Sequence, residues 1–247
     1  VTLIVSDVVG NLPEVIASGP TVPDPSTFQE ALDVIYKYNL ADDITTGVMN
    51  YLKEGASGIK PETPKPGDLV FDNVLNILAG TIQNALKGAK AEALKLGYKA
   101  FIIDDAVQGD VENVSEMIVS NASSFKNNPD IPKPVCLLFG GETTIRVTGE
   151  GLGGRNQHLS LTAAMRLQNL PGITVLAAGT DGNDGNTDAA GAVVDSETVS
   201  SALSKNINAS NYISEFDSHS FFRKAGGLVI TGPTFTNVMD LMVIIVE

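Results

Sequence analysis

Two short apolar runs, each followed by a glycine-rich loop, dominate the hydrophobic pattern of this chain of 247 residues. The runs cover residues 135–139 and 173–177. Apolar runs that end at glycine predict buried strands of an α/β sheet. Because open α/β sheets bind ligands at the carboxyl ends of their strands, we expect the loops after these strands, within 140–154 and 178–192, to form a ligand site.

The rest of the pattern alternates between helices and strands. Apolar residues recur at helical spacing over 81–96, which predicts an amphipathic helix ended by Gly97. Further helices are predicted at 26–38 (with a Ser26 and Gln29 capping box), 42–53, 110–125, 155–167 and 197–204. Further strands are predicted at 2–5, 71–78, 99–103, 143–148, 228–231 and 241–246, with a short mixed segment at 216–225. This order favours an α/β fold with a mixed sheet and flanking helices.

A break in the pattern at 126–134 is rich in proline and asparagine, which is typical of a boundary between domains. We therefore expect two α/β lobes that meet there, with residues 1–130 in the first and 131–247 in the second. The chain also starts directly on a predicted strand at Thr2, and we expect it to be a piece of a longer protein.

Arg155 is the residue whose position most needs an explanation. It stands at the start of a predicted helix, where the helix dipole does not favour a cation. A guanidinium is a planar fork suited to carboxylate and phosphate groups. Glycine-rich loops that lead into helix N-termini bind the same anions. We therefore expect Arg155 to bind an anionic ligand; the alternative is an ion pair with a neighbouring loop.

The charge balance restricts the kinds of partner that the chain is expected to bind. The chain has 16 basic and 29 acidic residues, a net charge of −13, which argues against a nucleic-acid partner. No stretch is long and apolar enough for a membrane span, and no basic signal segment precedes the first strand. The single cysteine, Cys136, is expected in the core, and a chain without an internal disulfide fits a reducing compartment. We expect a cytoplasmic protein, or a mitochondrial one if the form is eukaryotic.

Several motifs, in order along the chain, resemble one family. Gly140-Gly141-Glu142-Thr143-Thr144, Gly153-Gly154-Arg155-Asn156-Gln157 and Gly179-Thr180-Asp181-Gly182 are similar to the C-terminal MOFRL domain of class II glycerate kinases. Residues 231–241 resemble its closing motif. Residues 6–10 and 17–24 resemble the end of the family's N-terminal domain. The resemblance implies a Rossmann-like N-terminal lobe, of which only the later part is present, followed by a MOFRL domain. The chain departs from the family pattern at His158, and at Ile82 and Phe235, which are expected to alter a cleft wall.

The resemblance also implies an activity: ATP- and Mg²⁺-dependent phosphorylation of D-glycerate, at the 2-hydroxyl in most members, by a protein that can form a homodimer. It implies catalytic roles for Arg155, Asp7 and Asp181, and Mg²⁺ binding by Asp7, Glu142 and Asp181. The residues implied to bind substrate or nucleotide are Ser6, Ser18, Gly19, Thr21, Gly140, Gly141, Glu142, Thr143, Gly154, Asn156, Gln157, Gly179, Thr180, Gly182 and Asp184. For Asp184, a turn residue that caps backbone N–H groups is an equal alternative.

Two other functions stay open. Gly149, Gly151 and Gly154 satisfy the G-x-G-x-x-G spacing of dinucleotide-binding loops, which suggests an NAD(P)-dependent reductase acting on hydroxypyruvate. That motif expects an acid about 20 residues on, at the end of the next strand, and Asp181 comes later, in its own loop. The other alternative is a fragment that binds substrate or another subunit without catalysis. The loop at 180–191 does not fit an EF-hand, since it lacks both end ligands.

Overall fold

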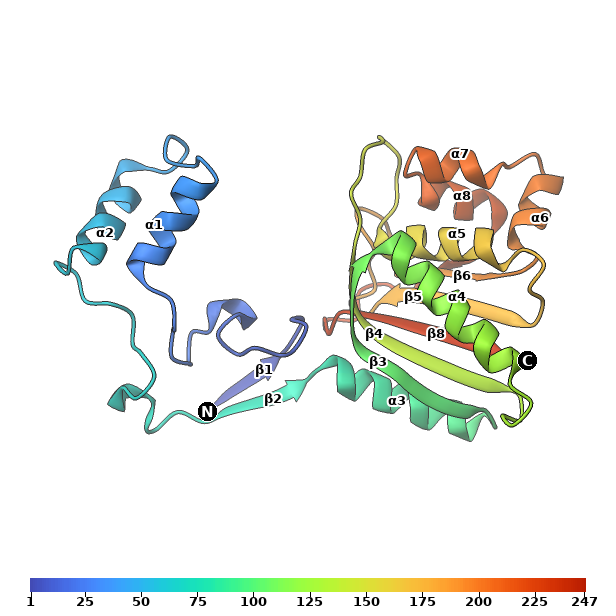
Figure 1. Cartoon of the computed structure of the whole chain (residues 1–247), viewed down its shortest axis with the longest axis horizontal. Helices are drawn as coiled ribbons and strands as arrows, with labels where there is room; N and C mark the ends of the chain where they lie inside the picture. Colours follow the sequence, from blue (N-terminus) through green and yellow to red (C-terminus); the bar gives the residue numbers. More distant parts are fainter. The chain divides into compact units, whose positions relative to one another are not determined.

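The computed structural model describes residues 1–247 and divides them into two compact units (Figure 1). The first unit consists of Val1–Ile4 and Leu12–Leu78, and the second of Val5–Asn11 and Ala79–Glu247. The predicted domain boundary at 130/131 does not coincide with this division, because the strands on either side of it lie in one sheet. The boundary at 130/131 therefore remains a prediction about where the two domains of the family meet.

The first unit contains the helices α1 (Phe28–Lys37) and α2 (Thr46–Ala56), which pack through Leu32, Ile35 and Met49. Two short 3₁₀ turns, η1 (Ile16–Ser18) and η2 (Leu69–Phe71), and a two-stranded sheet of β1 (Thr2–Val5) and β2 (Asn76–Gly80) complete the elements before α3. The strand predicted at 71–78 therefore begins later, at Asn76.

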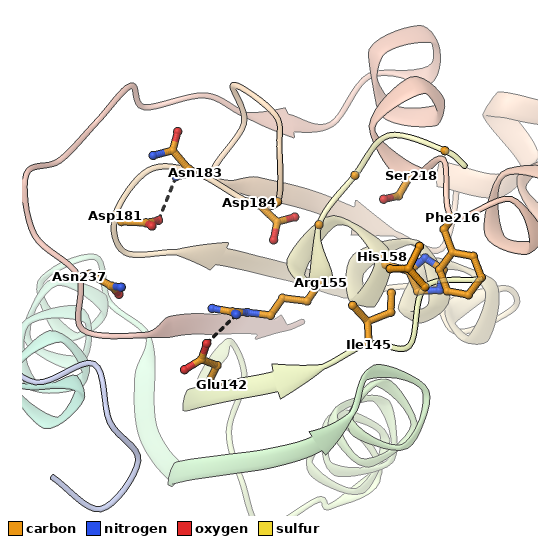
Figure 2. Close-up of a pocket in the computed structure, with 15 residues that line it drawn as sticks. Glu142, Ile145, Arg155, His158, Asp181, Asn183, Asp184, Phe216, Ser218 and Asn237 are labelled. Carbon is orange, nitrogen blue, oxygen red and sulfur yellow. Dashed lines mark hydrogen bonds and ion pairs between the residues drawn. The ribbon is translucent and has the colours of Figure 1, made fainter. Parts of the chain in front are cut away.

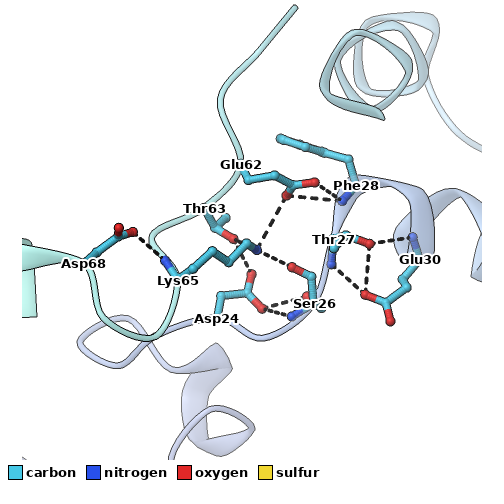
Figure 3. A network of polar contacts seen from close by, with 9 residues as sticks. All are labelled: Asp24, Ser26, Thr27, Phe28, Glu30, Glu62, Thr63, Lys65 and Asp68. Carbon is cyan, nitrogen blue, oxygen red and sulfur yellow. Dashed lines mark hydrogen bonds and ion pairs between the residues drawn. The ribbon is translucent and has the colours of Figure 1, made fainter. Parts of the chain in front are cut away.

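The capping box of α1 lies one residue later than predicted. Thr27 and Glu30 form it, because the hydroxyl of Ser26 donates to Asp24 Oδ1 at 2.6 Å instead (Figure 3). Hydrogen bonds from Ser26 and Thr63 hold the pKa of Asp24 below its ordinary value. Glu62 accepts from the backbone N–H of Phe28 at 3.1 Å and thereby ties the start of the helix to the segment before η2.

The second unit is built on a six-stranded mixed sheet in the order β3-β4-β8-β5-β6-β7. Its strands are β3 (Lys99–Asp110), β4 (Val135–Thr144), β5 (Ile173–Gly179), β6 (Gly191–Asp195), β7 (Leu228–Val229) and β8 (Asp240–Val246). Only β3 and β4 pair in parallel. Helices α3 (Ile82–Lys95), α4 (Val111–Asn127), α5 (Arg155–Leu167), α6 (Thr198–Ser204), α7 (Ala209–Ser214) and α8 (Ser218–Ala225) flank it. The α/β class with a mixed sheet is confirmed.

Strand β4 is apolar from Val135 to Phe139 because helices cover both faces of the sheet there. Val135, Leu137 and Phe139 belong to the core that α4 and α5 complete. Cys136 and Leu138 pack with Ile82 and Leu86 of α3, the helix that covers the opposite face of the sheet from α4 (Figure 1). Cys136 is a buried free thiol, as expected of a core residue.

Several predicted elements needed correction. The separate strand at 143–148 is wrong, because β4 continues through its two glycines to Thr144 while it pairs with β3 and β8. Strand β6 was not predicted. The mixed segment at 216–225 forms the helix α8, which buries Phe221 and Phe222. The bounds of α5 agree with the prediction. No helix has both the length and the apolar character to cross a membrane.

Candidate functional site

The candidate site lies where three neighbouring strands and one helix meet. Asp240, the first residue of β8, pairs with Gly141 on β4 and with Gly179 on β5. The two strands that carry the glycine-rich loops therefore flank one buried carboxylate, which is 1% exposed. Helix α5 begins beside it, at Arg155.

Arg155 uses its whole guanidinium in ion pairs. Its Nε and Nη2 donate to the two carboxylate oxygens of Asp240, at 2.6 and 3.1 Å. Its Nη1 lies 2.6 Å from Glu142 Oε1 (Figure 2). Burial acts to lower the pKa of Arg155, but the hydrogen bonds and negative charges of Asp240 and Glu142 outweigh it and raise that pKa. The ion pair considered as the alternative for Arg155 is present, and it fixes the guanidinium at the cavity wall.

Asp184 caps helix α5 from a distant loop. The N-cap residue, Gly154, has no side chain, and Asp184 replaces it by accepting the backbone N–H groups of Asn156 and Gln157 at 3.0 and 2.8 Å. Gln157 Nε2 donates to the same carboxylate at 3.0 Å. Burial raises the pKa of Asp184, and these hydrogen bonds oppose that shift. Asp184, Asn156 and Gln157 are therefore occupied with one another, as the capping alternative for Asp184 expected.

A cavity of about 500 Å³ opens over Arg155. Figure 2 shows Asp181, Asn183 and Asn237 on one side of Arg155, and Ile145, His158, Phe216 and Ser218 on the other. Arg155 is the single arginine or lysine in the wall, beside Glu142, Asp181 and Asp184. The cavity therefore has a charged end and an aromatic end, and Arg155 lies between them.

The glycines from Gly149 to Gly154 serve packing. A Cβ on Gly149 would lie 2.4 Å from the carbonyl oxygen of Glu215, and one on Gly151 would lie 2.5 Å from Asp217 Cβ. A Cβ on Gly154 would lie 2.3 Å from Asp184 Cγ. These positions have no room for a side chain, because the segment runs against the α7–α8 connection and the Asp184 loop. Gly151, Gly153 and Gly154 also line the Arg155 cavity, so the expectation that this run offers its backbone to a ligand stays a prediction.

The other predicted binding residues fall into three groups. Asp181 and Glu142 line the Arg155 cavity. Asp7 lines a separate hollow of about 550 Å³ with Gln108 and Thr144, and Glu142 borders both hollows. Ser18, Gly19 and Thr21 belong to the first compact unit, in which Thr21 Oγ1 donates to Asn76 Oδ1. The loop at 6–10 thus does not line the same cavity as the loop at 179–185.

The remaining predicted residues support the architecture. Thr180 Oγ1 donates to the carbonyl of Met239 at 2.7 Å and accepts from Val238 N at 2.9 Å. Ser6 is buried and bonded to Val8, and Thr143 is buried in β4. Four glycines, Gly140, Gly141, Gly179 and Gly182, approach neighbouring residues too closely for a Cβ. Ile82 packs against one of them, Gly140, in the core, and Phe235 is 98% exposed, so neither lines the Arg155 cavity.

The sequence reasoning missed several site residues. Asn237 and Asp240 were visible only as part of the closing motif, and Phe216 and Ser218 gave no signal. His158, where the chain departs from the family pattern, is 4% exposed, stacks on Phe216 with centroids 5.1 Å apart, and lines the cavity. Burial lowers the pKa of His158. The other histidine, His219, is buried beside Gln157 Oε1, 3.0 Å from its Nδ1.

Comparison with known proteins places this arrangement in a family. The MOFRL family model matches residues 135–240, and a model described only as a domain of unknown function matches residues 1–53. A glycerate kinase of Macaca fascicularis is 35% identical over 97% of this chain and 70% of its own length. The chain belongs to the class II glycerate kinase family.

Two further members support this assignment. The D-glycerate 2-kinase of Thermotoga maritima is 39% identical over 98% of this chain and 55% of its own length. A crystal structure titled as glycerate kinase from the same organism matches with a TM-score of 0.85 and 38% identity, over 99% of this chain and 56% of the solved one. The chain thus spans about half the length of these family members.

Proposed function

We propose that this chain is part of a glycerate kinase, which transfers a phosphoryl group from ATP to a hydroxyl of D-glycerate, the 2-hydroxyl being the expected acceptor. The names and the 35–39% identity of the relatives support the reaction class. The structural observation that carries the proposal is Arg155, the one arginine or lysine in the wall of the cavity.

Phosphoryl transfer needs positioning and positive charge around the transferred group, with little covalent chemistry from the protein. Asp240 holds the Nε and Nη2 edge of Arg155 through a side chain that is 1% exposed. Glu142, which is partly exposed, occupies Nη1 alone. An anionic ligand in the cavity would therefore replace Glu142 at Nη1, while Asp240 keeps the guanidinium in place. The substrate carboxylate or the transferred phosphoryl group would bind there.

The carboxylates at the charged end fit Mg²⁺, which prefers oxygen ligands. Asp181 and Glu142 line the cavity, and Asp7 lines the hollow that Glu142 also borders. No three Asp, Glu, His or Cys side chains lie close enough to hold a metal ion by themselves. Asp181 and Glu142 would thus hold Mg²⁺ together with phosphate oxygens of the nucleotide, and the ion would neutralise charge on the transferred group.

Asp181 is the better placed of the two predicted acids to accept the hydroxyl proton, because it lines the same cavity as Arg155 and Asp7 does not. Its Oδ1 accepts the backbone N–H of Asn183 at 3.0 Å, which orients the carboxylate (Figure 2). Asp7 remains a proposed Mg²⁺ ligand at the adjoining hollow.

We also propose that the chain forms a homodimer. Light scattering on the purified chain tests this, and a monomeric mass would refute it.

Two observations oppose the reductase alternative. Strands β4 and β5 flank α5 in sequence but are separated in the sheet by the antiparallel strand β8, whereas a dinucleotide-binding unit joins parallel strands that are neighbours in the sheet. Two of its glycines, Gly149 and Gly151, moreover lie against Glu215 and Asp217. The other alternative is a fragment that binds substrate without catalysis. The following experiment distinguishes it from a kinase.

The test is Arg155→Lys in the complete enzyme, with kinetics and melting temperature measured on the same preparation. Arginines that stabilise phosphoryl transfer contribute roughly 10³–10⁵ in rate. Because an ammonium keeps the charge but cannot reproduce the bidentate fork, we expect kcat/KM to fall by less than that full range but at least about a hundredfold. Arg166→Lys is the matched control: Arg166 lies on the same helix and pairs with Glu112, outside the Arg155 cavity. Near-normal kinetics in a folded Arg155→Lys enzyme would refute the proposed role.

A further inference from the structure

The aromatic end of the Arg155 cavity is built from parts of the chain that phosphoryl transfer does not require. The rings of Phe216 and His158 lie stacked, 5.1 Å apart and 12° from parallel. Ile145, from the segment between β4 and α5, lines the same end. Figure 2 shows Phe216, His158 and Ile145 on the side of Arg155 opposite to Asp181. A flat, mostly apolar subsite therefore adjoins the charged one.

This end also offers hydrogen-bonding groups that the protein leaves free. Ser218 is 1% exposed and lines the cavity, and its Oγ has no hydrogen-bond partner. His158 is 4% exposed, and its Nδ1 has no partner either. Buried polar groups in proteins are almost always paired, so two unpaired groups at one end of a cavity indicate that a ligand or water completes them.

The size of the cavity points the same way. Pockets of about 300–1,000 Å³ hold ligands the size of a drug molecule, and this cavity measures about 500 Å³. A three-carbon acid would fill only part of it. The charged end suits phosphates and a carboxylate, whereas the aromatic end suits a flat ring with polar edges.

We propose that the aromatic end, formed by Phe216, His158 and Ser218, binds the purine base of the phosphate donor. The base stacks on the Phe216–His158 pair, and its polar edge bonds to Ser218 Oγ. The phosphates extend past Arg155 towards Asp181. This inference rests on the proposed kinase function and adds the subsite that selects a nucleotide over other phosphate donors.

Calorimetric titration of the purified chain with ATP and, separately, with inorganic tripolyphosphate tests the inference, because the second ligand has the phosphates without the base. For Phe216→Ala we expect ATP to bind roughly 5- to 150-fold more weakly, which is the usual loss when a base loses its aromatic partner. Tripolyphosphate should bind within about twofold of the parent value, since its contacts lie at the charged end. Phe216→Tyr keeps the ring and should restore ATP binding.

Two further variants distinguish a loss of ATP binding from a loss of folded protein. Phe235→Ala removes an aromatic ring that is 98% exposed and outside the cavity wall, so ATP affinity should not change. Ser218→Ala removes a hydroxyl without a protein partner, so the fold should be retained while ATP binds about 2- to 12-fold more weakly, the range for one hydrogen bond.

The outcomes separate the two proposals. If the parent chain binds ATP and neither Phe216→Ala nor Ser218→Ala weakens it, the base subsite is refuted while the kinase proposal stands. Equal losses for ATP and tripolyphosphate would also refute it, because the effect would then not depend on the base. If the parent chain binds neither ligand, both the subsite and an ATP site in this chain are refuted.

Discussion

Replacing Asp240 by asparagine tests whether this buried carboxylate holds Arg155 in place. The substitution keeps the size of the side chain and removes the charge that faces Nε and Nη2. The amide oxygen of the asparagine can still accept one of the two hydrogen bonds. Glu142 remains as the second partner of the guanidinium.

The expected loss follows from the burial of the two partners. Breaking a fully buried ion pair costs about 3–5 kcal/mol, but the side chain of Arg155 is 33% exposed, so water compensates part of the lost interaction. A hydrogen bond to a charged group contributes about 1.5–3 kcal/mol. We therefore expect Asp240→Asn to lower the free energy of unfolding by about 2 kcal/mol, which corresponds to a fall in melting temperature of about 4–8 °C for a chain of this size.

Arg155→Met should destabilise more strongly, because it leaves Asp240 buried and charged without a cation. The double variant Arg155→Met/Asp240→Asn removes that stranded charge and should be more stable than Arg155→Met alone, by about 1 kcal/mol or more. Denaturant unfolding of the four proteins completes the double-mutant cycle. If the double variant loses the sum of the two single losses, the two side chains are not coupled and the positioning role of Asp240 is wrong.

Three further predictions concern the same unit. Asp184→Ala uncaps α5 and should lower the free energy of unfolding by about 2 kcal/mol, against less than about 0.5 kcal/mol for the exposed Asp188→Ala; equal effects in denaturant unfolding would contradict the capping role. Burial lowers the pKa of His158, so the unfolded chain binds more protons and stability falls as the pH drops through about 6.5. His158→Phe should therefore show a flatter melting temperature between pH 7.5 and 5.5, and parallel profiles would refute this. Calorimetry should detect only weak Mg²⁺ binding without nucleotide, and tight binding by the bare chain would oppose a site that needs phosphate oxygens.

Local pattern was sufficient for much of the architecture. The spacing of apolar residues gave α3, α4 and α5 to within two residues, because an amphipathic face repeats along the chain itself. The apolar run at 135–139 predicted a strand buried on both faces, and the structure packs its alternate residues against different helices. The family could likewise be recognised from motifs at 140–144, 153–157 and 179–182, since their order along the chain is a property of the sequence alone.

Contacts between distant residues had to come from the tertiary structure. Arg155 and Asp240 are 85 positions apart and meet only because β8 inserts between β4 and β5. Pairing with β8 also extends β4 through Gly140 and Gly141, whereas the glycines in the sequence had predicted a loop there. The close contacts of Gly149 and Gly151 with Glu215 and Asp217 show that this glycine run is also a packing surface. No local pattern encodes these neighbours, because each arises when the strands of the sheet take their order in the folded chain.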